Sequence, residues 1–548
     1  MNTKQLWLVL SVALATAALS DSATLAQSPA AATQPTTPAA PVQPTPPPAA
    51  AAPAPPPAAA TAAAPASAHP EARRPPAAAR LPGEITTIQY LEVPDRRFQF
   101  KATAGAIPLY DASDGSLQAE VAYVAYVKSD AEPVRPVTFV FNGGPGSSSA
   151  YLQLGAMGPW LLSLDHITPS TPPTLVPNRE TWLDFTDLVF VDPPGTGYSR
   201  IAASGEGPRR QFWSIDGDAQ ALAVFIRKWI ERTGRQSSPK FLVGESYGGF
   251  RVPKIARLLQ EGQDVGVNGL VLISPVLDFG FRNLSSRLPE RWMSALPSMA
   301  ATAREAKASG EGGFDPAALQ DVEDYAAGDY LRDLMRGPRD RAAVDRISAK
   351  VAELTGLDPE LVRRLGGRVD SSTFEREFYR RQSLVASSYD ATITAPDPDP
   401  NAARSHYPDP MLSAMAAPLT LAMTDLYRNN LHWRVEDQYR LQNGEVTRNW
   451  DFGRGRGSPQ VLDDIAQVMA ADPHVHVLVT HGASDLVTPY FETKLILNQL
   501  PATVADRAVF ALYGGGHMYY SRDKSRAALR ADAQALYRAS LPEATLRE

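Results

Sequence analysis

The hydrophobic pattern changes its period along the chain, and the changes separate strands from helices. Residues 85–93 and 119–128 alternate apolar with polar side chains, as β-strands do. The stretches at 136–144 and 187–199 contain continuous apolar runs that end in glycines or in Pro-Pro-Gly, which predicts buried strands followed by tight turns. Residues 214–233 have apolar side chains at helical spacing and predict an amphipathic helix.

The alternation of strands with helices continues to about residue 280. The stretch "KFLVGESYGG" (240–249) predicts a strand that runs into a turn, residues 252–262 predict a helix, and residues 268–279 predict a further strand. Strands that alternate with helices build layered folds around a largely parallel sheet. We therefore expect an α/β fold with a mostly parallel central sheet.

A long helical segment interrupts this pattern. Residues 281–455 are mostly helical in period, and strand patterns return only at 474–485 and 506–517. We interpret 281–455 as a helical cap insertion between two parts of the core, 83–280 and 456–548. An insertion that leaves the carboxyl ends of parallel strands would lie over the crevice where such sheets bind ligands.

The first residues have the pattern of an export signal. Lys4 is the only charged residue before an apolar stretch at 6–19, and small residues follow. This is typical of a signal peptide, here residues 1–26. A membrane anchor is the alternative, but the stretch is shorter than the about 20 residues that a spanning helix needs. We expect a periplasmic or secreted protein with no stable membrane span after cleavage.

Composition adds three constraints. Residues 27–82 are dominated by alanine and proline, with 17 prolines from position 28 to 82, and predict a disordered linker that cannot build a core. The net charge of −6 and the pI of about 5.9 give no reason to expect nucleic acid as a partner. The chain has no cysteine, so it forms no disulfide after export.

A candidate nucleophile lies in "GESYG", where Ser246 stands between Gly244 and Gly248. This is the pattern of a nucleophile elbow, a sharp turn from strand to helix that exposes a serine at the edge of the sheet. Short patterns of this kind occur by chance in long chains. Here a predicted strand precedes the serine and a predicted helix follows, which is the context that the turn requires.

A serine hydroxyl needs a base to take its proton. In folds with a nucleophile elbow, the acid and then the histidine follow the serine along the chain. Asp485 comes just after a predicted strand, and His517 lies in a glycine-rich loop after the last one. The order Ser246, Asp485, His517 predicts a catalytic triad.

Metal sites are the competing interpretation of some polar residues. His474, His476 and His481 lie on or near one strand and raise the possibility of zinc, but no fourth ligand has suitable spacing. Asp397 and Asp399 lack the spacing of a calcium loop, and Asp-Pro repeats usually form turns. We expect neither a metal nor a cofactor.

Acyl transfer also needs donors for the oxyanion. One is the backbone N–H after the nucleophile, here that of Tyr247, and the other comes from a loop after an earlier strand. The loop "FNGGPGSSS" (141–149) fits, and we assign the second donor to the N–H of Gly144. A phosphate-binding loop is disfavoured, because no Gly-Lys-Ser/Thr ending follows.

Taken together, "NGGPGSSS", "GESYGG", "GASD" and "GGGHM" resemble the motifs of the serine carboxypeptidases, a family with the α/β-hydrolase fold. Asn178 and Trp182 also fit that family's pattern, and the resemblance spans about residues 85–548. Members of the family release the C-terminal residue of peptides. The resemblance implies Ser246 as nucleophile, His517 as general base and acid, and Asp485 as the residue that orients His517.

The resemblance also implies a site for the substrate's terminal carboxylate, made by Asn142, the N–H of Gly143, and Glu245. Glu245 would be protonated when it meets that carboxylate, because two ionised carboxylates at contact distance repel and share a proton. This explains a carboxyl group directly before a nucleophile. The expected partners are therefore peptides with a free C-terminus.

Two positions depart from the family pattern. Many relatives have a second glutamate fourteen residues after the motif's asparagine, where this chain has Ala156, and a tryptophan two residues before it, where this chain has Val140. An esterase or acyltransferase with the same triad is the alternative function, since the triad and oxyanion hole serve any acyl transfer. A non-catalytic protein would be expected to lack a triad residue, and none is missing.

Overall fold

The computed structural model describes a single compact unit within Pro75–Glu548, in the ranges 80–129, 134–163, 167–308, 315–402, 407–453 and 457–541. The expected signal peptide and residues 27–79 of the expected linker lie outside the described residues. Leu81 is already buried, and its backbone N–H donates to Glu120. The packed part of the chain thus includes residues before the expected boundary at 83.

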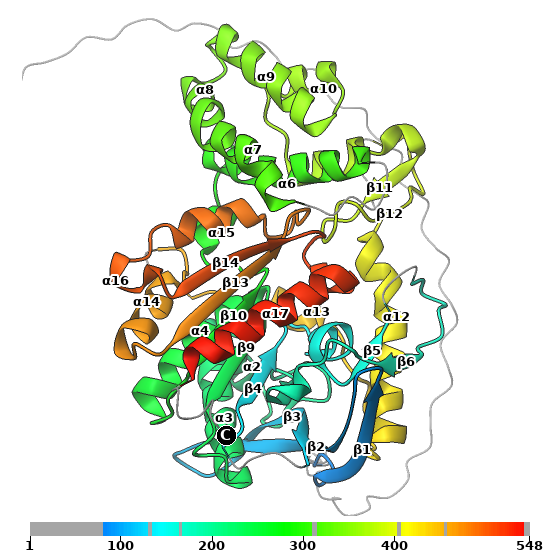
Figure 1. The fold of residues 1–548 in the computed structure, drawn as a ribbon, viewed down its shortest axis with the longest axis vertical. Coiled ribbons are helices and arrows are strands. Elements are labelled where there is room, and N and C mark those ends of the chain that lie inside the picture. The colour runs from blue at the N-terminus through cyan, green and yellow to red at the C-terminus, as the bar shows by residue number, and fades with distance from the viewer. Residues whose placement is uncertain are drawn as a thin grey trace, which may run out of the picture. The chain divides into compact units, whose positions relative to one another are not determined.

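A ten-stranded sheet forms the centre of this unit (Figure 1). Its first four strands pair antiparallel, and every later pair is parallel. The order is β1 (Ile85–Val93), β2 (Arg96–Tyr110), β3 (Leu117–Lys128), β7 (Asp187–Val191), β4 (Val137–Phe141), β9 (Lys240–Glu245), β10 (Gly269–Ile273), β13 (His476–Gly482) and β14 (Ala508–Tyr513), with β8 (Arg200–Ile201) on β3. The predicted α/β class with its mostly parallel sheet is confirmed.

Helices cover both faces of the parallel part. Strands β4 and β10 are buried along their whole length, as expected of a sheet covered on both sides. Phe241 and Val243 of β9 pack with α17 (Asp523–Ser540) on one face of the sheet. Leu242 packs on the opposite face with three further helices. These are α3 (Ile215–Thr233), α4 (Tyr247–Gly262) and α14 (Leu462–Ala471).

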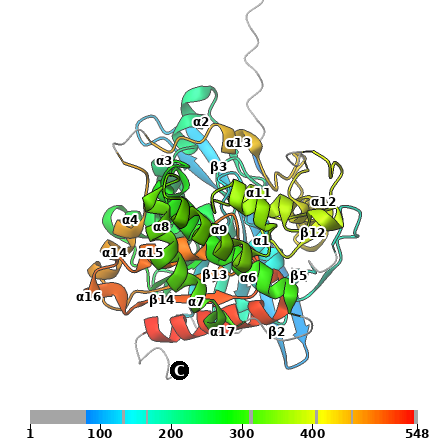
Figure 2. The same ribbon diagram turned by 90° about the horizontal axis from the view of Figure 1, so that it is seen from above.

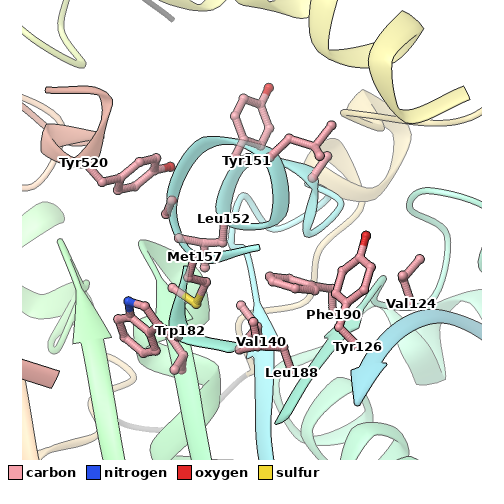
Figure 3. Packing of buried hydrophobic residues seen from close by; sticks show 14 of the residues in the cluster. Val124, Tyr126, Val140, Tyr151, Leu152, Met157, Trp182, Leu188, Phe190 and Tyr520 are labelled. Carbon is pink, nitrogen blue, oxygen red and sulfur yellow. The ribbon is translucent and has the colours of Figure 1, made fainter. Parts of the chain in front are cut away.

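The apolar cluster on the α17 face reaches the carboxyl end of the strands. Figure 3 shows Val140, Leu188 and Phe190 from neighbouring strands close together, with Tyr151 and Tyr520 at the edge of the cluster. Val140 is fully buried there. The smaller elements near this end include α1 (Ala150–Leu152), β5 (Trp160–Leu162), β6 (Leu175–Pro177) and α2 (Glu206–Phe212).

The segment after β10 is mostly helical and forms its own apolar cluster, which Ala483, Leu486, Tyr490 and Phe491 join from the segment after β13. Figure 1 shows α6–α10 grouped at one end of the sheet, beside α15 (Tyr490–Leu497). In the view from above they lie over the sheet (Figure 2). The helices are α5 (Phe279–Arg282), α6 (Glu290–Lys307), α7 (Gln320–Tyr325), α8 (Leu331–Arg336), α9 (Arg341–Thr355), α10 (Pro359–Arg364), α11 (Ser371–Glu377), α12 (Pro410–Asp425) and α13 (Gly444–Arg448), with the hairpin β11 (Leu384–Ala386)–β12 (Thr394–Pro396) between α11 and α12.

Candidate active site

Ser246 lies between the end of β9 and the start of α4. Its φ is +60°, in a region that residues with a side chain rarely adopt, so the turn is strained. The surrounding backbone fixes it: the Ser246 N–H donates to Ile273 O at 2.9 Å, and Val276 donates to Ser246 O at 3.2 Å. A strained turn held by the end of the neighbouring strand and by the residues after it is what a nucleophile elbow requires.

The glycines of "GESYG" are explained by contacts. A Cβ on Gly244 would lie 2.1 Å from the carbonyl oxygen of Gly248, and a Cβ on Gly248 would lie 2.5 Å from the carbonyl oxygen of Phe141. Neither backbone atom can move without displacing a strand or helix. The two glycines therefore allow α4 to start directly against β4 and β9.

Asp485 and His517 meet as the chain order predicts. Asp485 Oδ2 accepts from His517 Nδ1 at 2.8 Å, and both side chains are buried. Thr488 donates to the same oxygen at 2.6 Å, while its backbone N–H donates to Asp485 Oδ1 at 2.9 Å. Asp485 is thus fixed by the loop that follows it, and it in turn fixes the His517 ring with Nε2 free for other contacts.

The electrostatic environment of His517 has opposing parts. Burial lowers the pKa of His517, but the charge of Asp485 and its hydrogen bond, with a smaller contribution from Glu245, raise it, and the net shift is upward. A protonated His517 ring is stabilised mainly by Asp485. The geometry and the direction of this shift suit a general base.

One pocket brings most of the predicted site residues together. It has a volume of about 290 Å³, and Ser246 and His517 both line it. The predicted oxyanion and carboxylate residues line it as well: Asn142, Gly143, Gly144, Glu245 and Tyr247. Asp485 does not line the pocket, because it is buried behind His517.

The loop after β4 lies directly against the start of α4. A Cβ on Gly143 would be 2.5 Å from the backbone nitrogen of Tyr247, so only glycine allows this approach. Gly144 has a φ of +103°, a conformation that glycine adopts readily. Arg251 of α4 donates to the carbonyl oxygen of Asn142 at 2.5 Å and so ties the loop to the nucleophile helix.

Glu245 is a buried carboxyl group with donors aimed at it. Asn142 Nδ2 donates to one oxygen, and the Tyr520 hydroxyl lies 3.0 and 3.1 Å from the two oxygens. Burial raises the pKa of Glu245 to about 7, against the opposing effects of His517 and of these two hydrogen bonds. Below neutral pH the group is therefore mostly protonated and has an O–H to donate.

Ala156 lies where many relatives have a second glutamate. It is buried, and its carbonyl oxygen accepts from the Asn178 side chain at 2.9 Å. Asn178 also donates to Gly158 O at 2.8 Å, while Trp182 is buried in the adjacent cluster. Asn178 thus ties down the end of the helical turn Gln153–Met157, and neither Asn178 nor Trp182 lines the pocket.

Sequence reasoning missed Tyr520 and Thr488. Tyr520 is three residues after His517, and Thr488 is three residues after Asp485. Each donates to a carboxyl group of the site, Glu245 or Asp485. Their short spacing from the predicted residues is the only signal that the sequence offers for them.

The residues weighed as metal ligands do not form a ligand cluster in the part of the chain that the structure describes. His476 and His474 make hydrogen bonds within their own turn, and burial lowers the pKa of His481 to about 3. Asp397 pairs with Arg376. Within the described ranges, no group of three or more histidine, cysteine, aspartate or glutamate side chains could hold a metal ion, and no helix is long and apolar enough to cross a membrane.

The sheet and the serine turn have the arrangement of the α/β-hydrolase fold, and part of the chain matches a known family. Residues 94–335 match the family model described as "Serine carboxypeptidase". The structure resembles that of Kex1(delta)p, a prohormone-processing carboxypeptidase from Saccharomyces cerevisiae, with a TM-score of 0.51 and 15% identity over 80% of this chain and 91% of that one. The predicted resemblance to the serine carboxypeptidase family is confirmed.

Curated relatives match over shorter lengths. Serine carboxypeptidase-like 5 from Arabidopsis thaliana is 29% identical over 170 residues, which are 29% of this chain and 38% of the relative. Pheromone-processing carboxypeptidase KEX1 from Pyricularia oryzae is 36% identical over 118 residues, 21% of this chain and 17% of the relative. The matched parts thus span less than two fifths of these relatives.

Proposed function

We propose that this protein is a serine-type carboxypeptidase that hydrolyses the C-terminal peptide bond of peptides through an acyl-enzyme on Ser246. The observation that carries the proposal is the place of Glu245, buried and next to Ser246 in one pocket, with a pKa raised by burial to about 7. A protonated carboxyl there donates to a carboxylate, whereas an ester or an internal peptide bond offers no such partner.

The first half of the reaction follows from the pocket. The second N–H of Asn142, the N–H of Gly143 and the Glu245 O–H bind the terminal carboxylate and place the last peptide bond at Ser246. His517 takes the Ser246 proton as the oxygen attacks the carbonyl carbon, and the N–H groups of Gly144 and Tyr247 stabilise the oxyanion. His517 then gives the proton to the leaving amine, and the C-terminal amino acid departs.

Water completes the cycle. His517 takes a proton from water as its oxygen attacks the acyl carbon, and the proton returns to Ser246 when the ester bond breaks. The products are the shortened peptide and the free enzyme. Asp485 holds the His517 ring in the orientation that both halves need.

A peptide mixture analysed by mass spectrometry tests the proposal. We expect loss of single residues from C-termini only, with Ser246→Ala slower by about 10⁴-fold or more at unchanged melting temperature. Cleavage within chains, or wild-type turnover by a folded Ser246→Ala protein, would contradict the proposal.

We also infer export, supported by the apolar stretch at 6–19 after Lys4. The mature protein, recovered from the periplasm or the medium, is expected to lack its first 20 to 26 residues. N-terminal sequencing checks this, and an intact Met1 on the cytoplasmic protein would contradict it.

A further inference from the structure

A cation lies at the mouth of the same pocket. Arg282 is the last residue of α5 and lines the pocket with Ser246 and His517. Its Nη1 donates to the carbonyl oxygen of Val487 at 2.6 Å, which fixes one edge of the guanidinium. Four further N–H bonds of the group remain for other acceptors.

The strand order places Arg282 on the acyl side of the scissile bond. Asn142 and Gly143 follow β4 and Glu245 ends β9, so the carboxylate site lies over β4 and β9. Arg282 comes after β10 and Val487 after β13, and these strands lie on the other side of β9 from β4. With the terminal residue over β4 and Ser246 at the end of β9, the preceding residue extends toward Arg282.

Among the described residues, the hydrogen-bond partner of the Arg282 guanidinium is a backbone carbonyl and not a carboxylate. None of the described carboxylates forms a salt bridge with it, and the acidic side chains of Asp278, Asp485 and Glu492 have other partners or no charge. Asp278 accepts from the Gly280 N–H at 2.6 Å and caps α5, and Asp485 is bound to His517. Burial raises the pKa of Glu492 to about 8 even though the charge of Arg282 opposes the shift, so that group is mostly neutral at pH 7.

The walls beside Arg282 are apolar. Val276, Phe279 and Phe452 line the pocket there, and the two phenylalanine rings meet edge to face at 4.9 Å. Such walls can cover the methylene groups of a substrate side chain.

We propose that Arg282 selects substrates with an acidic side chain, glutamate or aspartate, at the penultimate position. The inference rests on the proposed carboxypeptidase function and adds the substrate class. The carboxylate of that side chain would accept hydrogen bonds from the guanidinium while the next peptide bond lies at Ser246.

Three free-acid peptides that differ only at the penultimate position, with Glu, Gln or Lys, test the inference. For the wild type we expect kcat/KM to be about fivefold higher for Glu than for Gln, the upper end for a solvent-exposed ion pair. Arg282→Gln should bring that ratio to about one, and Arg282→Glu should favour Lys over Glu. Because each ratio is taken within one variant at one pH, a change in the pKa of His517 cancels.

Arg287→Gln is the matched control, since Arg287 is an exposed arginine five residues further along that does not line the pocket. It should keep the wild-type ratio. An equal loss of preference in Arg287→Gln, or a Glu/Gln ratio near one in the wild type, would overturn the inference about Arg282 and leave the proposed function untouched. Absence of any C-terminal cleavage by the wild type would contradict the proposed function as well.

Discussion

At the scale of single residues, the site depends on how burial and neighbouring groups set the charge of Glu245. A carboxyl group beside a nucleophile would oppose the oxyanion if it stayed ionised at all working pH values. Burial holds its pKa near 7, and the donors Asn142 and Tyr520 keep it in place in either protonation state.

The first prediction concerns Glu245→Gln. As pH rises through about 7, wild-type Glu245 loses its proton and repels the substrate carboxylate, so KM for a free-acid peptide should rise. The glutamine side chain stays neutral and keeps an N–H donor, so the KM of the variant should not change with pH. In the wild type, kcat should rise with pH as His517 becomes neutral. In the variant this rise should occur at lower pH, because Glu245 raises the pKa of His517.

The control for Glu245→Gln is the corresponding peptide amide, whose KM should show no rise in either protein. Glu245 and His517 interact, so the midpoints of the KM and kcat profiles give apparent pKa values that belong to the pair. If KM for acid and amide changed alike with pH, Glu245 would not be binding the carboxylate.

At the scale of elements, the start of α4 determines how the site is assembled. The sequence predicts this helix from residue 252, but α4 begins at Tyr247, directly after Ser246. Two glycines and Pro253 hide the helical period, because they are poor helix formers in isolation. Contacts of Gly244 and Gly248 with backbone carbonyls, and the bond from Arg251 to Asn142, override that local preference.

The second prediction compares two glycines of α4. Gly248→Ala places a methyl group 2.5 Å from Phe141 O, so it should push the helix from β4, lower stability by about 1–3 kcal/mol and lower kcat. Gly262→Ala is the control, since no atom lies within 4 Å of its added Cβ. It should be neutral or stabilising by up to about 1 kcal/mol. Thermal unfolding and kcat check both, and equal behaviour of the two variants would argue against the steric account.

At the scale of the whole molecule, the sequence was most informative where a local rule was strong. The period-2 and apolar strand patterns gave the sheet, and the fixed order of serine, acid and histidine was enough to select Asp485 and His517, which the structure brings into contact. Tyr520 could not be selected, because its role depends on how the loop after β14 folds back onto β9. The same holds for Arg282, whose place in the pocket depends on the strand order.

The third prediction concerns the N-terminal part. Residues 1–74 are rich in alanine and proline, so their removal should leave the melting temperature and turnover unchanged. Removal of residues 1–83 should lower stability by about 2–4 kcal/mol, because Leu81 is buried and the Trp433 indole donates to Gly83 O at 3.0 Å. Thermal unfolding of the two truncated proteins checks this, and an equal melting temperature would show that residues 75–83 contribute nothing.

The central claim is that the site selects a free C-terminus through a protonated Glu245. The most direct test is kcat/KM of the wild-type protein at about pH 6, below the pKa of about 7, on one peptide as free acid and as amide. The account predicts roughly 10- to 100-fold faster hydrolysis of the free acid, the value of a hydrogen bond to a charged group. Equal rates, or faster hydrolysis of the amide, would contradict it.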